Sequence, residues 1–262
     1  MDLELAGKRV LVTGASKGIG LAIVRAFRAE GASVTAVSRR STPELAATGA
    51  TFVAADLSEA DGPARMVEAV LAADPRLDVL VNNAGGGSLP EGSLGNVLDG
   101  GDDIWLDVFA LNFSSAVRVT RAALPALTEA RGAIVNISSS AARRPGHAPL
   151  PYSAAKAALN IFSRGLAERV AQEGVRVNTV SPAATRTPAM AGEGGYLSQV
   201  AGALGVEHAD LVAGLPKEVG MLTDSLIEPD EIARAVLLLS SPTMPSAIGS
   251  NWVVDAGSVK AA

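Results

Sequence analysis

The sequence contains no cysteine and only two histidines, His147 and His208, among its 262 residues. The absence of cysteine excludes disulfide bonds, a thiol nucleophile and thiolate metal sites. The two histidines stand far apart in the sequence, which also disfavours an imidazole metal cluster. We therefore predict a protein without a metal site.

Aromatic residues make up 3% of the chain and charged residues 19%, whereas hydrophobic residues make up 48%. Such a core of Ala, Val, Leu and Ile is typical of a parallel sheet covered by helices. The net charge is −5, without a basic stripe, which disfavours a nucleic-acid partner. No apolar run reaches the ~18 residues of a membrane span. Residues 1–5 lack the charge and apolar run of a signal peptide, so we expect a cytoplasmic protein.

Apolar runs rich in Val and Ile alternate with segments of helical periodicity. Strands are predicted at residues 8–13, 33–37, 51–54, 78–81, 133–137, 175–180 and 250–254. Helices are predicted at residues 19–30, 64–73, 104–130 and 230–240, and from Pro151 to a stop at Gly174. This alternation predicts an α/β fold with a doubly wound parallel sheet and helices on both faces. Because no linker, repeat or change in composition interrupts it, we expect residues 1–262 to form a single domain.

Two stretches break the alternation. Residues 85–101 hold seven glycines, and residues 185–225 are rich in Gly, Ala and Met. Ligands of open α/β sheets bind outside the carboxyl ends of the strands. Both stretches are therefore predicted to border a site, residues 185–225 as a substrate cover; the alternative is a plain surface insertion.

Tyr152 and Lys156 stand four positions apart, and Ser139 stands thirteen positions before Tyr152 (152 − 139 = 13). On a helix, residues four apart share one face. A phenol, an ammonium and a hydroxyl are the groups needed to pass a proton to or from an alcohol oxygen. The cation can favour the phenolate, which would bring a tyrosine pKa of about 10 towards neutral pH. The alternative is an ordinary helical tyrosine and a serine at a strand end.

Gly14, Gly18 and Gly20 lie between the first predicted strand and the helix after it. Glycines there permit a tight turn and let a diphosphate approach backbone N–H groups at the helix N-terminus. The strand before and the helix after make this turn a predicted dinucleotide site.

With Asn82-Asn83-Ala84-Gly85 and Asn112 in order between them, these motifs resemble the short-chain dehydrogenase/reductase family over residues 6–257. The resemblance implies a seven-stranded Rossmann-like sheet, a nicotinamide dinucleotide, and hydride transfer between an alcohol and a carbonyl. It makes Tyr152 the general acid/base and Lys156 the residue that lowers its pKa and holds the nicotinamide ribose. Ser139 would hydrogen-bond the reacting oxygen, and Asn112 would support a water that leads protons to Lys156.

The resemblance also implies which residues hold the dinucleotide. They are Gly14, Ser16, Lys17, Gly18, Ile19 and Gly20 in the glycine turn, Asp56 and Leu57 at the adenine, Asn83, Ala84 and Gly85 at the adenosine ribose, Tyr152 and Lys156 at the nicotinamide ribose, and Pro182, Ala183, Thr185 and Thr187 at the carboxamide. Two alternatives stay open: Asp56 as a simple helix cap, and Asn82 as a tie between strand ends. Ala183 stands where the family usually has Gly.

The choice of dinucleotide depends on the end of the second strand. An acidic residue there would bond the ribose 2′-hydroxyl and repel a 2′-phosphate. Here Ser38, Arg39 and Arg40 follow the strand, and Lys17 lies in the glycine turn. Cations there suit a phosphomonoester, so NADP(H) is favoured over NAD(H). The alternative is that the arginines, Arg40 in particular, only solvate a surface turn.

The sequence thus predicts an NADP(H)-dependent oxidoreductase that interconverts a carbonyl and a secondary alcohol. Its partner would be a small-molecule substrate, and the resemblance implies a homotetramer or homodimer. The rivals are an NAD(H)-dependent alcohol dehydrogenase, a dinucleotide-binding regulator or scaffold, and an epimerase or dehydratase of nucleotide sugars. Arg143, Arg144 and His147, between Ser139 and Tyr152, either recognise an acidic substrate or are solvated loop residues.

Overall fold

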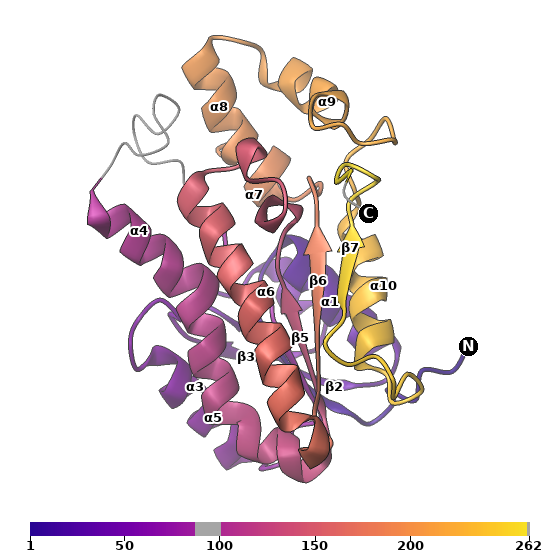
Figure 1. The fold of residues 1–262 in the computed structure, drawn as a ribbon. Coiled ribbons are helices and arrows are strands. Elements are labelled where there is room, and N and C mark those ends of the chain that lie inside the picture. The colour runs from indigo at the N-terminus through magenta and orange to yellow at the C-terminus, as the bar shows by residue number, and fades with distance from the viewer. Residues whose placement is uncertain (87–100, 261–262) are drawn as a thin grey trace.

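A computed structural model describes residues 1–86 and 101–260 of the chain. A seven-stranded parallel sheet in the order β3-β2-β1-β4-β5-β6-β7 forms its centre (Figure 1). The strands are β1 (Arg9–Thr13), β2 (Ser33–Ser38), β3 (Thr51–Ala54), β4 (Val79–Asn82), β5 (Ala133–Ile137), β6 (Arg176–Pro182) and β7 (Asn251–Val254). The strand order reverses between β1 and β4, which is the place where open α/β sheets bind ligands. The Rossmann-like fold predicted from the sequence is confirmed.

Helices cover both faces of the sheet (Figure 1). One face carries α1 (Gly18–Ala29) and α10 (Pro229–Ser240), and the other carries α3 (Gly62–Ala73), α5 (Ser115–Ala130) and α6 (Leu150–Val170). Side chains of β1 alternate between the two layers: Val10 and Val12 pack with α1 and α10, and Leu11 with α3 and α5. Because the central strands are buried on both faces, they are rich in Val, Leu and Ile.

Residues 104–130, predicted as one helix, are divided in the structure. They form α4 (Asp102–Phe109), a π-helical turn at Ala110–Ser114, and α5. A π turn inserts an extra residue into a helix and is frequent at functional sites. This turn contains Asn112, which is 1% exposed.

Residues 185–225, predicted as a substrate cover, contain three helices. They are α7 (Pro188–Ala191), α8 (Tyr196–Leu204) and α9 (His208–Glu218); α8 and α9 lie at the top of Figure 1, with α7 below α8. The other short elements are α2 (Pro43–Ala46) and the 3-10 turns Ser140–Ala142, Pro145–His147 and Ala171–Glu173. Most of the other predicted border, residues 85–101, lies outside the described residues. Within the described ranges, no helix combines the length and apolarity needed to cross a membrane.

Candidate active site

Tyr152, Lys156 and Ser139 meet at the carboxyl edge of the sheet. Ser139 follows β5, and the other two lie one turn apart on α6, which starts at Leu150 with Pro151 in its first turn. The Nζ of Lys156 lies 5.7 Å from the centroid of the Tyr152 ring. It donates a hydrogen bond to the carbonyl of Ile137 at 2.9 Å, and Lys156 is 3% exposed. The structure therefore brings together the phenol, the ammonium and the hydroxyl that the sequence singled out.

Burial is the largest influence on the pKa values of Tyr152 and Lys156. It raises the pKa of Tyr152 above its usual value, whereas a hydrogen bond with the Ser139 side chain acts in the opposite direction. Burial also lowers the pKa of Lys156 to about 8. The lowered tyrosine pKa expected from the sequence is thus wrong for this structure. The physical reason is that both groups leave water, and desolvation disfavours each charged form.

The π turn places Asn112 beside this group. Its Oδ1 accepts from the N–H of Gly86 at 2.9 Å, and its Nδ2 donates to the carbonyls of Gly86 and Val108 at 2.8 and 2.9 Å. A Cβ added to Gly85 would lie 2.9 Å from Oδ1 of Asn112 and 3.0 Å from Nζ of Lys156. Asn112, Gly85 and Lys156 therefore converge on one point.

The glycine turn joins β1 to α1 and has no room for a side chain at Gly14 or Gly20. A Cβ on Gly20 would lie 2.2 Å from the carbonyl oxygen of Gly14. The Nδ2 of Asn83 donates to the carbonyls of Thr13 and Gly14 at 2.9 and 3.0 Å, which fixes the turn against the end of β4. Among the described residues, no side chain caps the N-terminus of α1, and its first turn holds no acidic residue. Open N–H groups at a helix N-terminus fit a diphosphate.

Ser16 and Ile19 complete the turn with Lys17. The Ser16 carbonyl accepts from the Thr42 hydroxyl at 3.0 Å, which connects the turn to the segment after β2.

Lys17, Arg39 and Arg40 are all exposed. None of the ion pairs within residues 1–86 and 101–260 involves these three cations. The structure thus gathers exposed cations around the end of β2, where Ser38 donates to the Arg40 carbonyl at 2.8 Å. The Asp56 carboxylate after the neighbouring strand β3 lies near enough to Arg39 to be affected by its charge.

Asp56 lies at the turn after β3. Its carboxylate accepts from the hydroxyl and the N–H of Ser58 at 2.6 and 3.0 Å. These bonds, and to a smaller degree the charge of Arg39, lower the pKa of Asp56. The cap of α3 is Asp61, so the alternative of Asp56 as a helix cap is wrong. The next residue, Leu57, is buried among the side chains of α3.

Asn82 connects the ends of neighbouring strands, which was one of the two alternatives left open by the sequence. Its Nδ2 donates to Thr120 and to Asn136 at 3.0 and 2.8 Å, and Asn136 donates on to Ser163 of α6 at 2.8 Å. Ala84 follows, with its N–H donated to the Thr13 hydroxyl at 3.0 Å. This buried network fixes α5 and α6 against the middle of the sheet.

The segment after β6 closes the site from the other side. β6 ends at Pro182, and the Thr185 hydroxyl donates to the carbonyl of Ala183 at 2.9 Å. The Thr187 hydroxyl caps α7 by accepting from the N–H of Met190 at 3.2 Å. A Cβ on Gly18 would lie 3.0 Å from Cγ2 of Thr187. This segment therefore lies against the glycine turn, 169 positions earlier in the sequence (187 − 18 = 169).

Comparison with known proteins agrees with this arrangement. The family model described as short chain dehydrogenase matches residues 8–194. The chain belongs to the short-chain dehydrogenase family. It is 34% identical over 270 residues to an uncharacterized oxidoreductase, YvrD, of Bacillus subtilis, covering 99% of each chain.

Solved structures of this family resemble the fold closely. L-sorbose reductase from Gluconobacter frateurii, complexed with NADPH and L-sorbose, superimposes with a TM-score of 0.89 at 29% identity over 100% of both chains. A point variant of actinorhodin polyketide ketoreductase with NADPH gives a TM-score of 0.85 at 29% identity, over 96% of this chain and 97% of its own. This short-chain dehydrogenase is thus an oxidoreductase with the fold of proteins seen with a nicotinamide dinucleotide.

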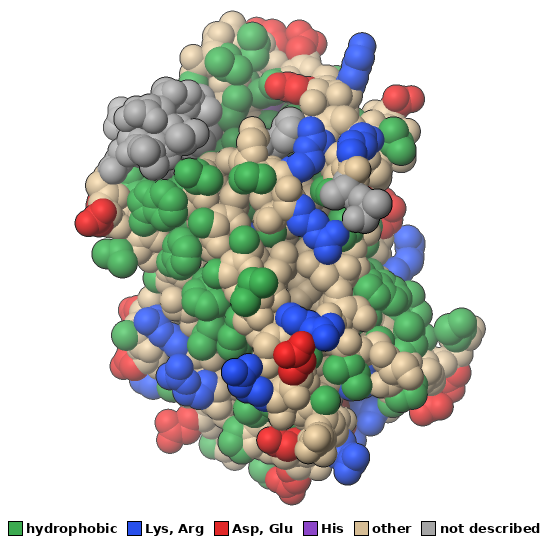
Figure 2. Space-filling view, viewed as in Figure 1, with side chains coloured by type: hydrophobic (Ala, Val, Ile, Leu, Met, Phe, Trp, Pro, Cys, Tyr) green, Lys and Arg blue, Asp and Glu red, His purple; other side chains and the backbone are tan. Residues whose placement is uncertain are grey.

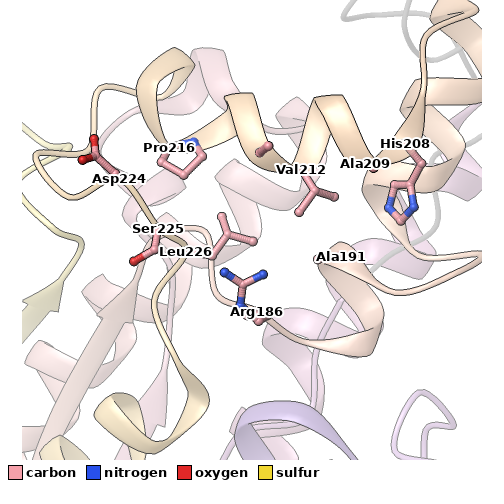
Figure 3. A pocket seen from close by; sticks show the side chains of 10 residues that line it. Arg186, Ala191, His208, Ala209, Val212, Pro216, Asp224, Ser225 and Leu226 are labelled. Carbon is pink, nitrogen blue, oxygen red and sulfur yellow. The ribbon is translucent and has the colours of Figure 1, made fainter.

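A cavity of 460 Å³ lies elsewhere in this short-chain dehydrogenase, beneath α9 (Figure 3). Its lining consists of Arg186, Ala191, His208, Ala209, Val212, Ala213, Pro216, Asp224, Ser225 and Leu226. The Nε2 of His208 is buried without a hydrogen-bond partner in the described structure. Since Tyr152 and Ser139 do not line it, we assign this cavity no part in the chemistry of the family.

Arg144 has a place that the sequence did not indicate. Its Nη1 donates to the carbonyl of Val219 at 2.8 Å and to that of Ser258 at 2.6 Å. It is therefore neither a solvated loop residue nor directed only at a substrate. No pattern could have revealed these two bonds, because the main-chain carbonyls that accept them lie 75 and 114 positions away.

Proposed function

We propose that this protein is an NADP(H)-dependent oxidoreductase that reduces a small-molecule carbonyl to a secondary alcohol. The observation that carries the proposal is the group of Ser139, Tyr152, Lys156 and Asn112 beside the uncapped N-terminus of α1. Two structures with the same fold, a sorbose reductase and a polyketide ketoreductase, contain NADPH. They support the dinucleotide and the direction of the reaction proposed here.

In this proposal Tyr152 is the acid. Burial keeps the phenol protonated through the neutral range, since it raises the Tyr152 pKa. The Ser139 hydroxyl holds the reacting oxygen within reach of that phenol. Once the proton has left, the charge on the phenolate is stabilised by the Lys156 ammonium and by the Ser139 hydroxyl. Asn112 keeps the backbone beside Lys156 in place through its bonds to Gly86.

The dinucleotide supplies the hydride when bound. We propose that the glycine turn and Lys17 hold its diphosphate, and that Ser38, Arg39 and Arg40 hold a 2′-phosphate. The remaining contacts are proposed as adenine to Asp56 and Leu57, adenosine ribose to Asn83, Ala84 and Gly85, nicotinamide ribose to Tyr152 and Lys156, and carboxamide to Pro182, Ala183, Thr185 and Thr187.

We also propose that the protein forms a homodimer or homotetramer through α4 and α6. Figure 2 shows apolar side chains gathered over these helices. Leu106 of α4 is 68% exposed and Ile161 of α6 is 77% exposed. The half-buried rings of Trp105, Phe109, Phe113 and Phe162 form a row of ring contacts on α4, the π turn and α6, with neighbouring centroids 6.1–6.4 Å apart. An exposed apolar face of this kind is typical of a protein–protein contact.

The activity is tested by NADPH oxidation with 9,10-phenanthrenequinone, cyclohexanone, ethyl acetoacetate and L-sorbose. We expect Tyr152→Phe to lower turnover by about 10²–10⁴-fold, because the general acid is lost, while the Kd for NADPH stays unchanged. The control is Tyr196→Phe, which removes the other of the two tyrosines and should retain turnover.

The rival functions give other results. Equal turnover by wild type and Tyr152→Phe would contradict the role given to Tyr152. Tight NADPH binding without turnover of any of the four compounds would favour the regulator or scaffold. Faster turnover with NADH than with NADPH would favour the NAD(H)-dependent alternative.

A further inference from the structure

We propose that Arg144 is a positioning residue for the substrate cover: it anchors the end of α9 and the C-terminal segment to the loop that carries Ser139, and so sets how tightly substrate is held. The part that concerns substrate rests on the reductase activity proposed above.

Arg144 is fixed relative to Ser139 by a short turn. The N–H of Ala142 donates to the carbonyl of Ser139 at 3.1 Å, and the N–H of Arg144 donates to that of Ser140 at 3.0 Å. The Ser139 hydroxyl accepts from the N–H of Ala141 at 3.1 Å. Arg144 is therefore held at a fixed place relative to the Ser139 side chain, five positions earlier (144 − 139 = 5).

The guanidinium of Arg144 binds the C-terminus of α9, where backbone carbonyls have no partner within the helix. Met221 donates to the carbonyl of Pro216 at 2.8 Å and Gly220 to that of Lys217 at 3.1 Å, a hydrogen-bond pattern that closes a helix C-terminus. The carbonyl of Val219, the last residue before this closure, accepts instead from Arg144. The negative end of the helix dipole favours a cation at this position.

The C-terminal segment forms one unit with this helix end. The N–H of Leu222 donates to the carbonyl of Ala256 at 2.7 Å. Lys260 donates to the carbonyls of Gly220 and Gly257 at 3.1 and 2.5 Å. The second bond of Arg144, to Ser258 at 2.6 Å, holds the same unit from the side of the Ser139 loop.

The other end of the cover is anchored independently. Thr185 forms a parallel bridge with Ile227, and Arg186 makes an ion pair with Glu228 at 2.8 Å. The helices α7, α8 and α9 are thus held at both ends, with Arg144 as an anchor at the α9 end. Loss of Arg144 removes the direct link between that end and the Ser139 loop and leaves its bonds to the C-terminal segment through Leu222 and Lys260. Tyr152, Lys156 and the glycine turn keep their own contacts.

The test compares Arg144→Met with wild type by amide hydrogen exchange and steady-state kinetics. We expect at least ~10-fold faster exchange at residues 219–222, where local opening becomes easier, and unchanged exchange in β5. For whichever of the four compounds wild type reduces best, KM should rise about tenfold with kcat within about twofold, because binding rather than chemistry is lost. The Kd for NADPH should not change. Arg144→Lys, which retains the charge, should recover part of the KM.

The control is Arg65→Met, which removes an exposed guanidinium of α3 that makes two ion pairs; neither exchange nor KM should change. If Arg144→Met does not fold, Lys260→Met loosens the same unit from its exposed side and should speed exchange at residues 219–222. Unchanged exchange in the folded variants, or a fall in kcat without a rise in KM, overturns the proposal. If wild type reduces none of the compounds, the reductase activity fails, and the exchange measurement still decides the anchor.

Discussion

Arg39 is the side chain on which the proposed preference for a 2′-phosphate mainly depends. It is exposed after β2 and near enough to Asp56 to contribute to the lowering of the pKa of that carboxyl. We expect Arg39→Asp to raise the Kd for NADPH about 10–100-fold, because a cation–phosphate contact is replaced by repulsion. The Kd for NADH should stay equal or fall. Fluorescence titration with both dinucleotides measures this directly.

Arg40 provides the comparison for Arg39. Because Arg40 is the arginine more consistent with a solvated turn, we expect Arg40→Asp to change the Kd for NADPH less than Arg39→Asp does. Equal weakening of NADPH and NADH binding in Arg39→Asp would show that the residue supports the turn rather than the phosphate.

Lys156 gives the protein a pH-dependent stability. Its pKa falls from 10.5 in water to about 8 in the folded chain, a difference of roughly 3 kcal/mol. Between these pH values the unfolded chain binds the extra proton, so this lysine destabilises the fold below pH 8, and the loss is recovered as pH rises. We expect Lys156→Met to be more stable than wild type at pH 7, by ~2–3 kcal/mol. The advantage should shrink between pH 8 and 10 in urea unfolding.

The exposed Lys217 is the matched control for Lys156. Lys217→Met should show no advantage that changes over the same pH range. A constant difference between wild type and Lys156→Met from pH 7 to 10 would contradict the burial of the ammonium as the cause.

Single residues also mark the limit of prediction from the sequence. The spacing of Tyr152, Lys156 and Ser139 was sufficient to place them together, because helix geometry and parallel-strand topology fix where such residues lie. The sequence was not sufficient to predict the direction in which the Tyr152 pKa shifts, since that direction depends on how far the Tyr152 and Lys156 side chains are removed from water. The anchoring by Arg144 could not be predicted either, as backbone carbonyls leave no pattern in a sequence.

Among the elements, the π turn between α4 and α5 depends on Asn112. This side chain makes three hydrogen bonds, to Gly86 twice and to Val108. We expect Asn112→Ala to lower the free energy of unfolding by ~1–3 kcal/mol, because buried backbone groups lose their partners. Urea unfolding measures the change. Ser115→Ala, which removes one bond to Leu111, should cost less; an equal loss in both would show that Asn112 has no special part in the turn.

Elements with regular patterns were predicted well, and interruptions were not. All seven strands lie within about two residues of their predicted bounds, since continuous Val and Ile runs are typical of strands buried on both faces. The helices α7, α8 and α9 were expected only as a cover, because Gly and Ala weaken helical periodicity there. The π turn left no signal, since a periodicity of 3.6 continues on both sides of it.

At the scale of the whole molecule, the sheet edge that gathers the site is distinct from the face proposed to join subunits. The site lies at the carboxyl ends of the strands, and the exposed apolar face lies on α4 and α6 (Figures 1 and 2). The two are nevertheless connected, because α6 carries Tyr152 and Lys156 at one end and Ile161 further along. Assembly through this face would therefore hold the catalytic helix from outside.

Ile161→Lys tests that assembly. Ile161 is 77% exposed in one chain, so a lysine there should change the stability of a free monomer little. In a contact between two copies, the same lysine would bury a charge without a partner. We expect the mass measured by light scattering after size exclusion to fall to that of one chain, with activity reduced as α6 loses its outer support. Leu204→Lys, on α8 and 61% exposed, should leave the mass unchanged. If wild type already has the mass of one chain, or Ile161→Lys retains the larger mass, subunits do not pair through α6.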